Sequence, residues 1–332
     1  MQIVGAGLQA FLDEQGRDFL PPFRQRFPWL GADLQTVRNS FSRKKPDVET
    51  HSRLYPRLDN GDAISVAVTE PAIQAVRKSL VLIHGLGGDE TSHYMKETAA
   101  VFSALGWHVY RMNARGVGPS RETSKPPYSA GLTRDLRAVL AEVHNHQKDN
   151  EIYAMGFSLG GQLLLRTLGE GAVPVDLKAG VSVSAPLDLA ASQRKLERRR
   201  NGVYVDYLVK NMRIDLEGTQ PPNQDISLDD IKTIRGFDEY IIGPYFGFDG
   251  ADDYYAGISC KTLIHDIQQP VIAIHSADDP WIPVEDYQNA HWPDVVAAGA
   301  VLLPRGGHVG FHCKYSSHPW YIRAAQEFFS VI

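Results

Sequence analysis

The chain has 332 residues, of which 43% are hydrophobic and 22% charged, and its formal net charge is −5 at pH 7. These values are ordinary for a globular protein, so they exclude a disordered chain and a coiled coil. The negative balance leaves no basic excess for nucleic acid, and no nucleic-acid partner is expected. The length suits one α/β core that carries an insertion.

The cysteines and the amino-terminal residues bear on the compartment. Cys260 and Cys313 cannot build a disulfide framework and form no Cys-x-x-Cys pair, so a reducing compartment is expected. Residues 1–20 lack the positive start and the long apolar core of a signal peptide. Nowhere does an apolar run reach the length of a membrane-spanning helix. These patterns predict a cytoplasmic protein with no integral membrane segment.

The first part of the chain is expected to be peripheral. Residues 1 to about 60 show little sustained periodicity and are predicted to form an arm that packs on the main body. Apolar residues alternate at Ile64, Val66 and Val68, which indicates a half-buried strand. The parallel sheet is expected to begin after this strand.

Strand and helix patterns then alternate along the chain. The run 80–83 is continuously apolar, as in strands that are covered on both faces. Residues 95–105 follow helical spacing, 107–111 read as the next strand, and 132–143 form a clear amphipathic helix. A further apolar run, 152–155, is the next strand. This alternation predicts a parallel sheet with helices on both faces.

A Gly-x-Ser-x-Gly motif, Gly156-Phe157-Ser158-Leu159-Gly160, follows that strand and precedes an apolar helix. Strand, sharp turn and helix are the context of a nucleophile elbow. The glycines leave room for a turn tight enough to expose the serine hydroxyl. Because Leu159 would begin the helix, its N–H can face a developing oxyanion. The motif alone is a weak signal, since an ordinary helix entry can carry the same residues.

Beyond the elbow, strands are predicted over 180–184 and 270–275, and residues 185–269 between them carry helical segments. An insertion there would roof the carboxyl ends of the strands, where open α/β sheets bind ligands. Its basic run, 193–200, could meet anionic headgroups, although a solvated helix face is the simpler interpretation. The predicted parts are an arm, 1–60, a core, 61–184 and 270–332, and a helical cap, 185–269.

A serine hydroxyl is a weak nucleophile near neutrality, so Ser158 needs a histidine base and a carboxylate that fixes the tautomer of this base. Candidates occur in the order Ser, Asp, His. Asp278 and Asp279 follow one predicted strand, and His308 follows the next. All of them would lie at the same edge of the sheet, so a catalytic triad can form there.

Within these candidates the residues favour one set. His308 stands out from the other histidines because glycines flank it just past a strand, which allows close approach to a substrate. His275 and His312 are the alternatives. The spacing of the proline-rich loop favours Asp279 as the acid, with Asp278 capping the loop or serving as the acid itself.

The sequence His84-Gly85-Leu86 follows the early strand and could complete an oxyanion hole. The backbone N–H of Leu86 would then face that of Leu159, and each donor is worth about 2.7–4 kcal/mol of transition-state stabilisation. His84 is expected to orient this loop or to be structural, because His308 is better placed as the base.

Together these motifs resemble the α/β-hydrolases and, more narrowly, the YheT-like esterases of the AB-hydrolase-4 family. The resemblance extends over nearly the whole chain, and its most family-specific part is a long cap segment. The residues that carry it are 28–36, 84–88, 113–120, 156–160, 233–255, 278–280 and 307–311.

The resemblance implies an α/β-hydrolase fold with Ser158 as nucleophile, Asp279 as acid and His308 as base. It also implies a carboxylesterase acting on medium-chain acyl esters, since members of the family look like such enzymes. Some relatives act on glycerolipids or transfer acyl groups to alcohols. Gly87 and Gly236 depart from residues common in the family, and these departures put the substrate preference in doubt.

The resulting prediction is a serine carboxylesterase that needs no metal or cofactor and cleaves short- to medium-chain acyl esters through an acyl-enzyme. The cap aromatics Tyr245, Phe246 and Phe248 are candidates for lining the acyl site, with plain cap core as the alternative. Acyl transfer or glycerolipid hydrolysis with the same triad, or ligand binding without catalysis, are the other readings of function. The expected partner is a small ester or lipid; peripheral membrane contact and the oligomeric state stay open.

Overall fold

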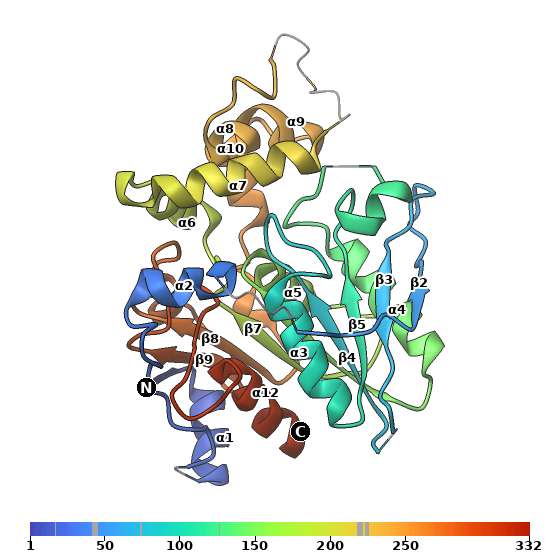
Figure 1. The fold of residues 1–332 in the computed structure, drawn as a ribbon, viewed down its shortest axis with the longest axis vertical. Helices are drawn as coiled ribbons and strands as arrows, with labels where there is room; N and C mark the ends of the chain where they lie inside the picture. The colour runs from blue at the N-terminus through green and yellow to red at the C-terminus, as the bar shows by residue number, and fades with distance from the viewer. Residues whose placement is uncertain (17, 42–45, 74, 126, 218–221, 223–225) are drawn as a thin grey trace.

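A computed structural model describes residues 1–332 apart from 17, 42–45, 74, 126, 218–221 and 223–225 (Figure 1). In this described part, one sheet has the strand order β1-β9-β8-β7-β6-β4-β5-β3-β2. The pairs from β5 through β4, β6, β7 and β8 to β9 are parallel, and β1, β2 and β3 pair antiparallel at the edges. The strands are Gln2–Val4 (β1), Ser52–Leu54 (β2), Val66–Thr69 (β3), Lys78–Ile83 (β4), His108–Met112 (β5), Glu151–Phe157 (β6), Leu177–Val183 (β7), Val271–Ser276 (β8) and Ala298–Leu303 (β9).

The inner strands are apolar on both sides because helices cover both faces of the sheet. Along β4, Leu80 and Leu82 join a hydrophobic cluster with α1, α3 and α12, whereas Val81 and Ile83 join a cluster with α4 and α5. The helices around the sheet are Ala6–Gln15 (α1), Ala32–Phe41 (α2), His93–Ala104 (α3), Thr133–His146 (α4), Leu159–Gly169 (α5), Val284–Gln288 (α11) and Trp320–Val331 (α12). This mostly parallel, three-layered arrangement agrees with the predicted fold class.

The amino-terminal segment is more than the arm that its sequence suggests. Strand β1 pairs with β9, near the other end of the chain, and β2 pairs with β3, so residues 1–60 supply both edge strands of the sheet. Each of these strands has only three residues, which is too short for a period to be visible in the sequence.

A group of helices lies together at the top of Figure 1, above the sheet. It is built around its own hydrophobic cluster, which includes Leu208, Met212, Phe237 and Tyr254. The elements are Leu189–Leu196 (α6), Gly202–Asp215 (α7), Ile234–Phe237 (α8), a π-helical turn Asp238–Ile242, Gly243–Tyr245 (α9) and Ala251–Ile258 (α10). None of the helices in the described ranges has the length and apolar character that a membrane span requires.

Candidate active site

Ser158 occupies the sharp turn between β6 and α5. Its φ of 51° lies in the left-handed region, which costs energy for a residue with a side chain. The turn requires glycine on both sides: a Cβ at Gly156 would lie 2.3 Å from the Gly160 carbonyl oxygen, and a Cβ at Gly160 would lie 2.4 Å from that of His84. The Ser158 N–H donates to the carbonyl of Val183 in β7 at 2.8 Å. The backbone therefore fixes the serine at the start of α5.

The structure brings the predicted serine, histidine and aspartate together. Ser158 Oγ lies 2.9 Å from His308 Nε2, and His308 Nδ1 lies 2.9 Å from Asp279 Oδ2. His308 is 5% exposed and Asp279 only 1%, so the imidazolium charge that develops during a reaction and the carboxylate beside it would both be shielded from water. The arrangement can move a proton from the serine hydroxyl to the imidazole.

The surroundings keep the Asp279 carboxylate ionised. Burial would raise the pKa of Asp279, but the charge of His308 and the hydrogen bond to it hold this pKa below its usual value. Backbone N–H groups of Trp281 and Ile282 donate to Asp279 Oδ1 at 2.8 and 3.0 Å. Oδ2 is left to face the histidine, and it can fix the imidazole tautomer there.

The loop that carries His308 is held by a second aspartate and by the amino-terminal segment. Asp278 Oδ1 accepts hydrogen bonds from the N–H groups of Gly306 and Gly307 at 2.8 and 2.9 Å. Thr36 Oγ1, in α2, accepts from the His308 N–H at 2.9 Å. Asp278 thus contacts the loop backbone, whereas Asp279 contacts the imidazole.

The two alternative histidines, His275 and His312, contact residues other than Ser158. Gln35, which is fully buried, accepts from the His312 N–H at 2.6 Å and donates to its carbonyl at 3.2 Å. Burial lowers the pKa of His312 to about 2 and that of His275 to about 4, so both are neutral. His275 Nδ1 lies 3.8 Å from Asp279 Oδ2, and the His275 ring stacks on Tyr287.

The two expected oxyanion donors lie beside the serine. Leu159 is the first residue of α5, where its N–H has no partner one turn earlier in the helix. Leu86 lies on the loop after β4 and lines the same cavity as Ser158 and Leu159. Their placement is compatible with an oxyanion between the two N–H groups.

Ser158 lies between two hollows. A cavity of about 110 Å³ under the cap has mostly apolar walls, and an open cleft of about 540 Å³ lies on the side of α2. The cavity walls include Tyr128, Leu208, Met212, Tyr254, Tyr255 and Trp281. The cleft is lined in part by Thr36, Tyr94, Tyr207 and His308.

The cap aromatics singled out from the sequence lie elsewhere. Tyr245 is 44% exposed and packs edge-to-face on Phe246, and Phe248 packs on Tyr254. Among the described residues, none of the three predicted aromatics lines either hollow beside Ser158. Phe246 and Phe248 pack against the cap's own hydrophobic cluster, and Tyr245 contacts Phe246.

Other aromatic residues, which were not predicted from the sequence, line the hollows beside Ser158 instead. The Trp281 ring lies 4.1 Å from the His308 ring and borders both hollows. Its position two residues after Asp279 was a usable signal, since the loop that positions the acid also brings the tryptophan to the site. Tyr254 and Tyr255 are the last two residues of the family-specific cap segment, 233–255. The resemblance singled out this segment, but nothing in the sequence indicated that its tyrosines line the cavity.

One carboxyl group lines the apolar cavity. Asp238 accepts a hydrogen bond from the Tyr255 hydroxyl at 2.6 Å and is 9% exposed. Burial raises the pKa of Asp238 to about 7, and the tyrosine hydroxyl offsets only part of that rise. Near neutrality this carboxyl is therefore divided between its neutral and its charged form.

The raised pKa of Asp238 predicts a pH-dependent stability. Between the ordinary pKa of 3.8 and about 7, the folded state keeps a proton that the unfolded state has lost, so the free energy of unfolding falls as the pH rises. The loss is at most about 1.4 kcal/mol for each unit of the shift. We expect Asp238→Asn, which still accepts from Tyr255, to flatten this slope in urea unfolding at about pH 5 and about pH 8. Equal slopes in the two proteins would contradict the assignment.

A serine in a strained strand-to-helix turn, a histidine and a buried carboxylate on a mostly parallel sheet define the class of α/β serine hydrolases. Comparison with known proteins agrees. Residues 74–291 match the Hydrolase_4 family, described as serine aminopeptidase, S33, and the chain belongs to this family.

Two curated relatives narrow the likeness. The chain is 30% identical over 272 residues to the putative esterase YheT of Escherichia coli, covering 79% of each chain. It is 28% identical over 293 residues to the monoacylglycerol lipase of Saccharomyces cerevisiae, covering 83% of this chain and 61% of that protein. The predictions of a YheT-like member of the AB-hydrolase-4 family and of a carboxylic ester hydrolase are confirmed at this level.

Solved structures support the fold. The esterase Pf2001 of Pyrococcus furiosus aligns with a TM-score of 0.59 and 15% sequence identity, over 95% of this chain and 98% of that chain. At this identity the similarity concerns the architecture alone. The predicted α/β-hydrolase fold is thereby confirmed.

Proposed function

We propose that the protein is a serine carboxylesterase that cleaves short- to medium-chain acyl esters through an acyl-enzyme on Ser158. The observation that carries the proposal is the hydrogen-bonded chain from Ser158 through His308 to Asp279, with 2.9 Å at each step. The relatives named esterase and monoacylglycerol lipase favour an ester substrate over the peptide that the family's description suggests.

In the proposed reaction, Ser158 Oγ attacks the ester carbonyl carbon while His308 Nε2 takes the hydroxyl proton. The carbonyl oxygen becomes an oxyanion, which the N–H groups of Leu86 and Leu159 stabilise. His308 then gives its proton to the departing alcohol, and the acyl group stays on the serine. A water molecule then gives a proton to His308 and attacks the acyl-enzyme, and His308 returns this proton to Ser158 Oγ as the acid is released. Asp279 holds the proton on His308 Nδ1 throughout.

The two hollows suggest where the halves of the ester bind. The small apolar cavity suits an acyl chain, since apolar walls exclude water and bury methylene groups. The open cleft suits the alcohol and the entering water, because it is larger and has polar groups such as Thr36 and Tyr94 on its walls. A cavity of about 110 Å³ favours short and medium acyl chains over long ones.

The same cleft gives a second candidate. An alcohol that enters it in place of water would take the acyl group, and the enzyme would then act as an acyltransferase on the same acyl-enzyme. A glycerol moiety would occupy the same space in a monoacylglycerol. Ligand binding without catalysis is less well supported, because the serine, histidine and aspartate lie in hydrogen-bonding contact.

Hydrolysis of p-nitrophenyl esters of increasing acyl length, together with labelling by a fluorophosphonate probe, tests the proposal. We expect labelling at Ser158 and a rate optimum at short or medium chains, and product analysis with added ethanol to separate hydrolysis from transfer. Labelling without hydrolysis of any ester would refute the substrate class. A protein that neither labels nor hydrolyses would be a binding module.

A further inference from the structure

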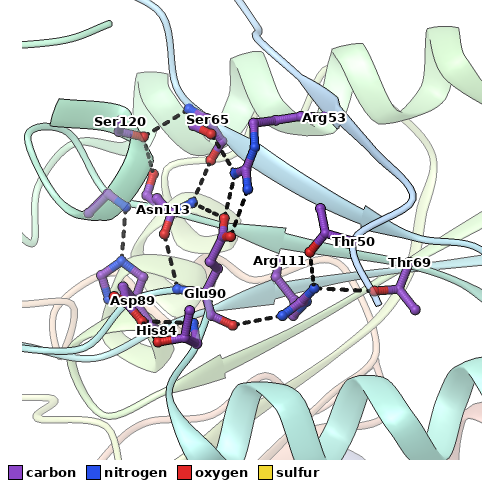
Figure 2. Close-up of polar contacts among 12 residues, drawn as sticks. Thr50, Arg53, Ser65, Thr69, His84, Asp89, Glu90, Arg111, Asn113 and Ser120 are labelled. Atoms are coloured by element: carbon purple, nitrogen blue, oxygen red, sulfur yellow. Dashed lines mark hydrogen bonds and ion pairs between the residues drawn. The ribbon is translucent and has the colours of Figure 1, made fainter. Parts of the chain in front are cut away.

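A polar network lies behind the loop that carries Leu86, and Figure 2 shows its members. The Arg53 guanidinium contacts both carboxylate oxygens of Glu90 at 2.6 and 2.8 Å. Asn113 donates to Glu90 Oε2 at 2.5 Å and to the Ser65 carbonyl at 3.0 Å, and it accepts from the Glu90 N–H at 3.0 Å. The network therefore ties the loop after β4 to the chain that leaves β5.

Ala114, the residue after Asn113, determines the tautomer of His84. The backbone N–H of Ala114 donates to His84 Nε2 at 2.9 Å, so Nε2 must be the unprotonated nitrogen. The ring is 2% exposed, and burial lowers the pKa of His84, so the imidazole is neutral. Its one proton then lies on Nδ1, which is 2.8 Å from the Gly85 carbonyl oxygen and donates to it.

That hydrogen bond sets the direction of the peptide between Gly85 and Leu86. The Gly85 carbonyl also accepts from the Gly88 N–H at 3.1 Å, and the Gly85 N–H donates to the Tyr94 hydroxyl at 3.1 Å. In a trans peptide the carbonyl and the following N–H point in opposite directions. The Leu86 N–H thus points away from the His84 ring, and within the described residues it has no hydrogen-bond acceptor.

The loop also lies directly against the nucleophile. A Cβ at Gly85 would be 2.9 Å from the Cβ of Ser158, and Leu86 and Ser158 line the same cavity. We propose that His84 is a positioning residue for oxyanion binding: its Nδ1–H holds the Gly85 carbonyl so that the Leu86 N–H faces the oxyanion formed on Ser158. This inference rests on the proposed function, because it assumes that an acyl transfer occurs at Ser158.

Two substitutions at the same position separate the two hydrogen bonds of the ring. In His84→Asn the amide reaches the place of Nδ1 and can still donate to Gly85, but the acceptor for Ala114 is lost. In His84→Gln the amide reaches the place of Nε2, so the contact to Ala114 is kept and the donor to Gly85 is lost. We expect His84→Gln to lower kcat by roughly a hundred- to a thousand-fold, as the loss of one oxyanion donor does, and His84→Asn to retain much more activity.

A purely structural role would not give this pattern. We expect KM for p-nitrophenyl butyrate to stay nearly unchanged in His84→Gln, and the affinity for a trifluoromethyl ketone, whose adduct carries the oxyanion, to fall in parallel with kcat. Melting temperatures identify variants that have lost folding. His108→Asn and His108→Gln are matched controls, because His108 is a buried histidine at the opposite end of the parallel strands, and their kcat should match wild type.

The outcomes distinguish the two proposals. Equal losses of kcat in the two folded His84 variants, or a loss of kcat without a loss of ketone affinity, would overturn the role of His84 while leaving the esterase intact. Nitrogen NMR of histidine-labelled protein reads the tautomer without any substrate, and a proton on His84 Nε2 would overturn the inference even if the enzyme proved inactive. A wild-type protein with the expected tautomer but no reaction at Ser158 would refute the proposed function, and with it the role in oxyanion binding.

Discussion

Ser158→Ala is expected to lower kcat for p-nitrophenyl ester hydrolysis by about six orders of magnitude. Alanine removes the atom that attacks the carbonyl, so no acyl-enzyme can form, while the N–H groups of Leu86 and Leu159 remain. These donors and substrate binding alone leave a residual acceleration of about a thousand- to ten-thousand-fold over water. Steady-state kinetics and mass spectrometry of the protein during turnover measure the two effects, and neither an acyl adduct nor a fluorophosphonate adduct should appear.

A matched control uses a serine next to the elbow. Ser182, in β7, is fully buried, and in the described structure its hydroxyl has no hydrogen-bond partner. Ser182→Ala should therefore keep kcat and labelling while it removes the same functional group from the strand beside the elbow. A Ser158→Ala protein that retains its rate within a few-fold would show that another residue is the nucleophile.

Asp279→Asn is expected to lower kcat by about ten-thousand-fold without loss of the fold. The asparagine oxygen can still accept from the N–H groups of Trp281 and Ile282, so its amide NH₂ turns toward His308. An NH₂ group cannot accept from His308 Nδ1, and the histidine proton moves to Nε2. The nitrogen that should take the Ser158 proton is then already protonated. KM should change little, because the substrate does not contact this carboxyl group.

Asp278→Asn is the comparison that decides between the two aspartates. Its Oδ1 can continue to accept from the N–H groups of Gly306 and Gly307, so the loop should stay in place and kcat should fall far less than in Asp279→Asn. If Asp278→Asn is the more damaging change, the acid has been assigned to the wrong residue.

Much of the fold could be predicted because buried apolar residues recur with the period of the helix or strand that contains them. The expected helix over 132–143 is Thr133–His146 in the structure, and the expected strand over 107–111 is His108–Met112. Chain order placed Ser158, Asp279 and His308 after three strands of one sheet, so convergence at one edge was foreseeable from topology. A single sequence therefore predicts local secondary structure and the order of the elements along the chain well.

Contacts between distant segments were beyond the sequence. The support of His308 by Thr36 depends on how α2 returns to the site, and no local pattern indicates that approach. The same holds for two aromatic residues near expected functional segments. Trp281 lines the cavity and contacts His308, whereas Tyr245 does not line the cavity. Only tertiary packing distinguishes them. The residue types identify candidate site residues, but only tertiary packing determines which of these candidates lie at the site.

The contact between α2 and the His308 loop has a consequence for biosynthesis. Gln35 and Thr36 leave the ribosome long before His308 and His312, and β1 pairs with β9 across a similarly long interval. The nascent chain can build β4, β6 and α5, and thus the elbow, well before its histidine is in place. Reactivity at Ser158 should therefore appear only after the segment that carries His308 has been made and has packed against α2.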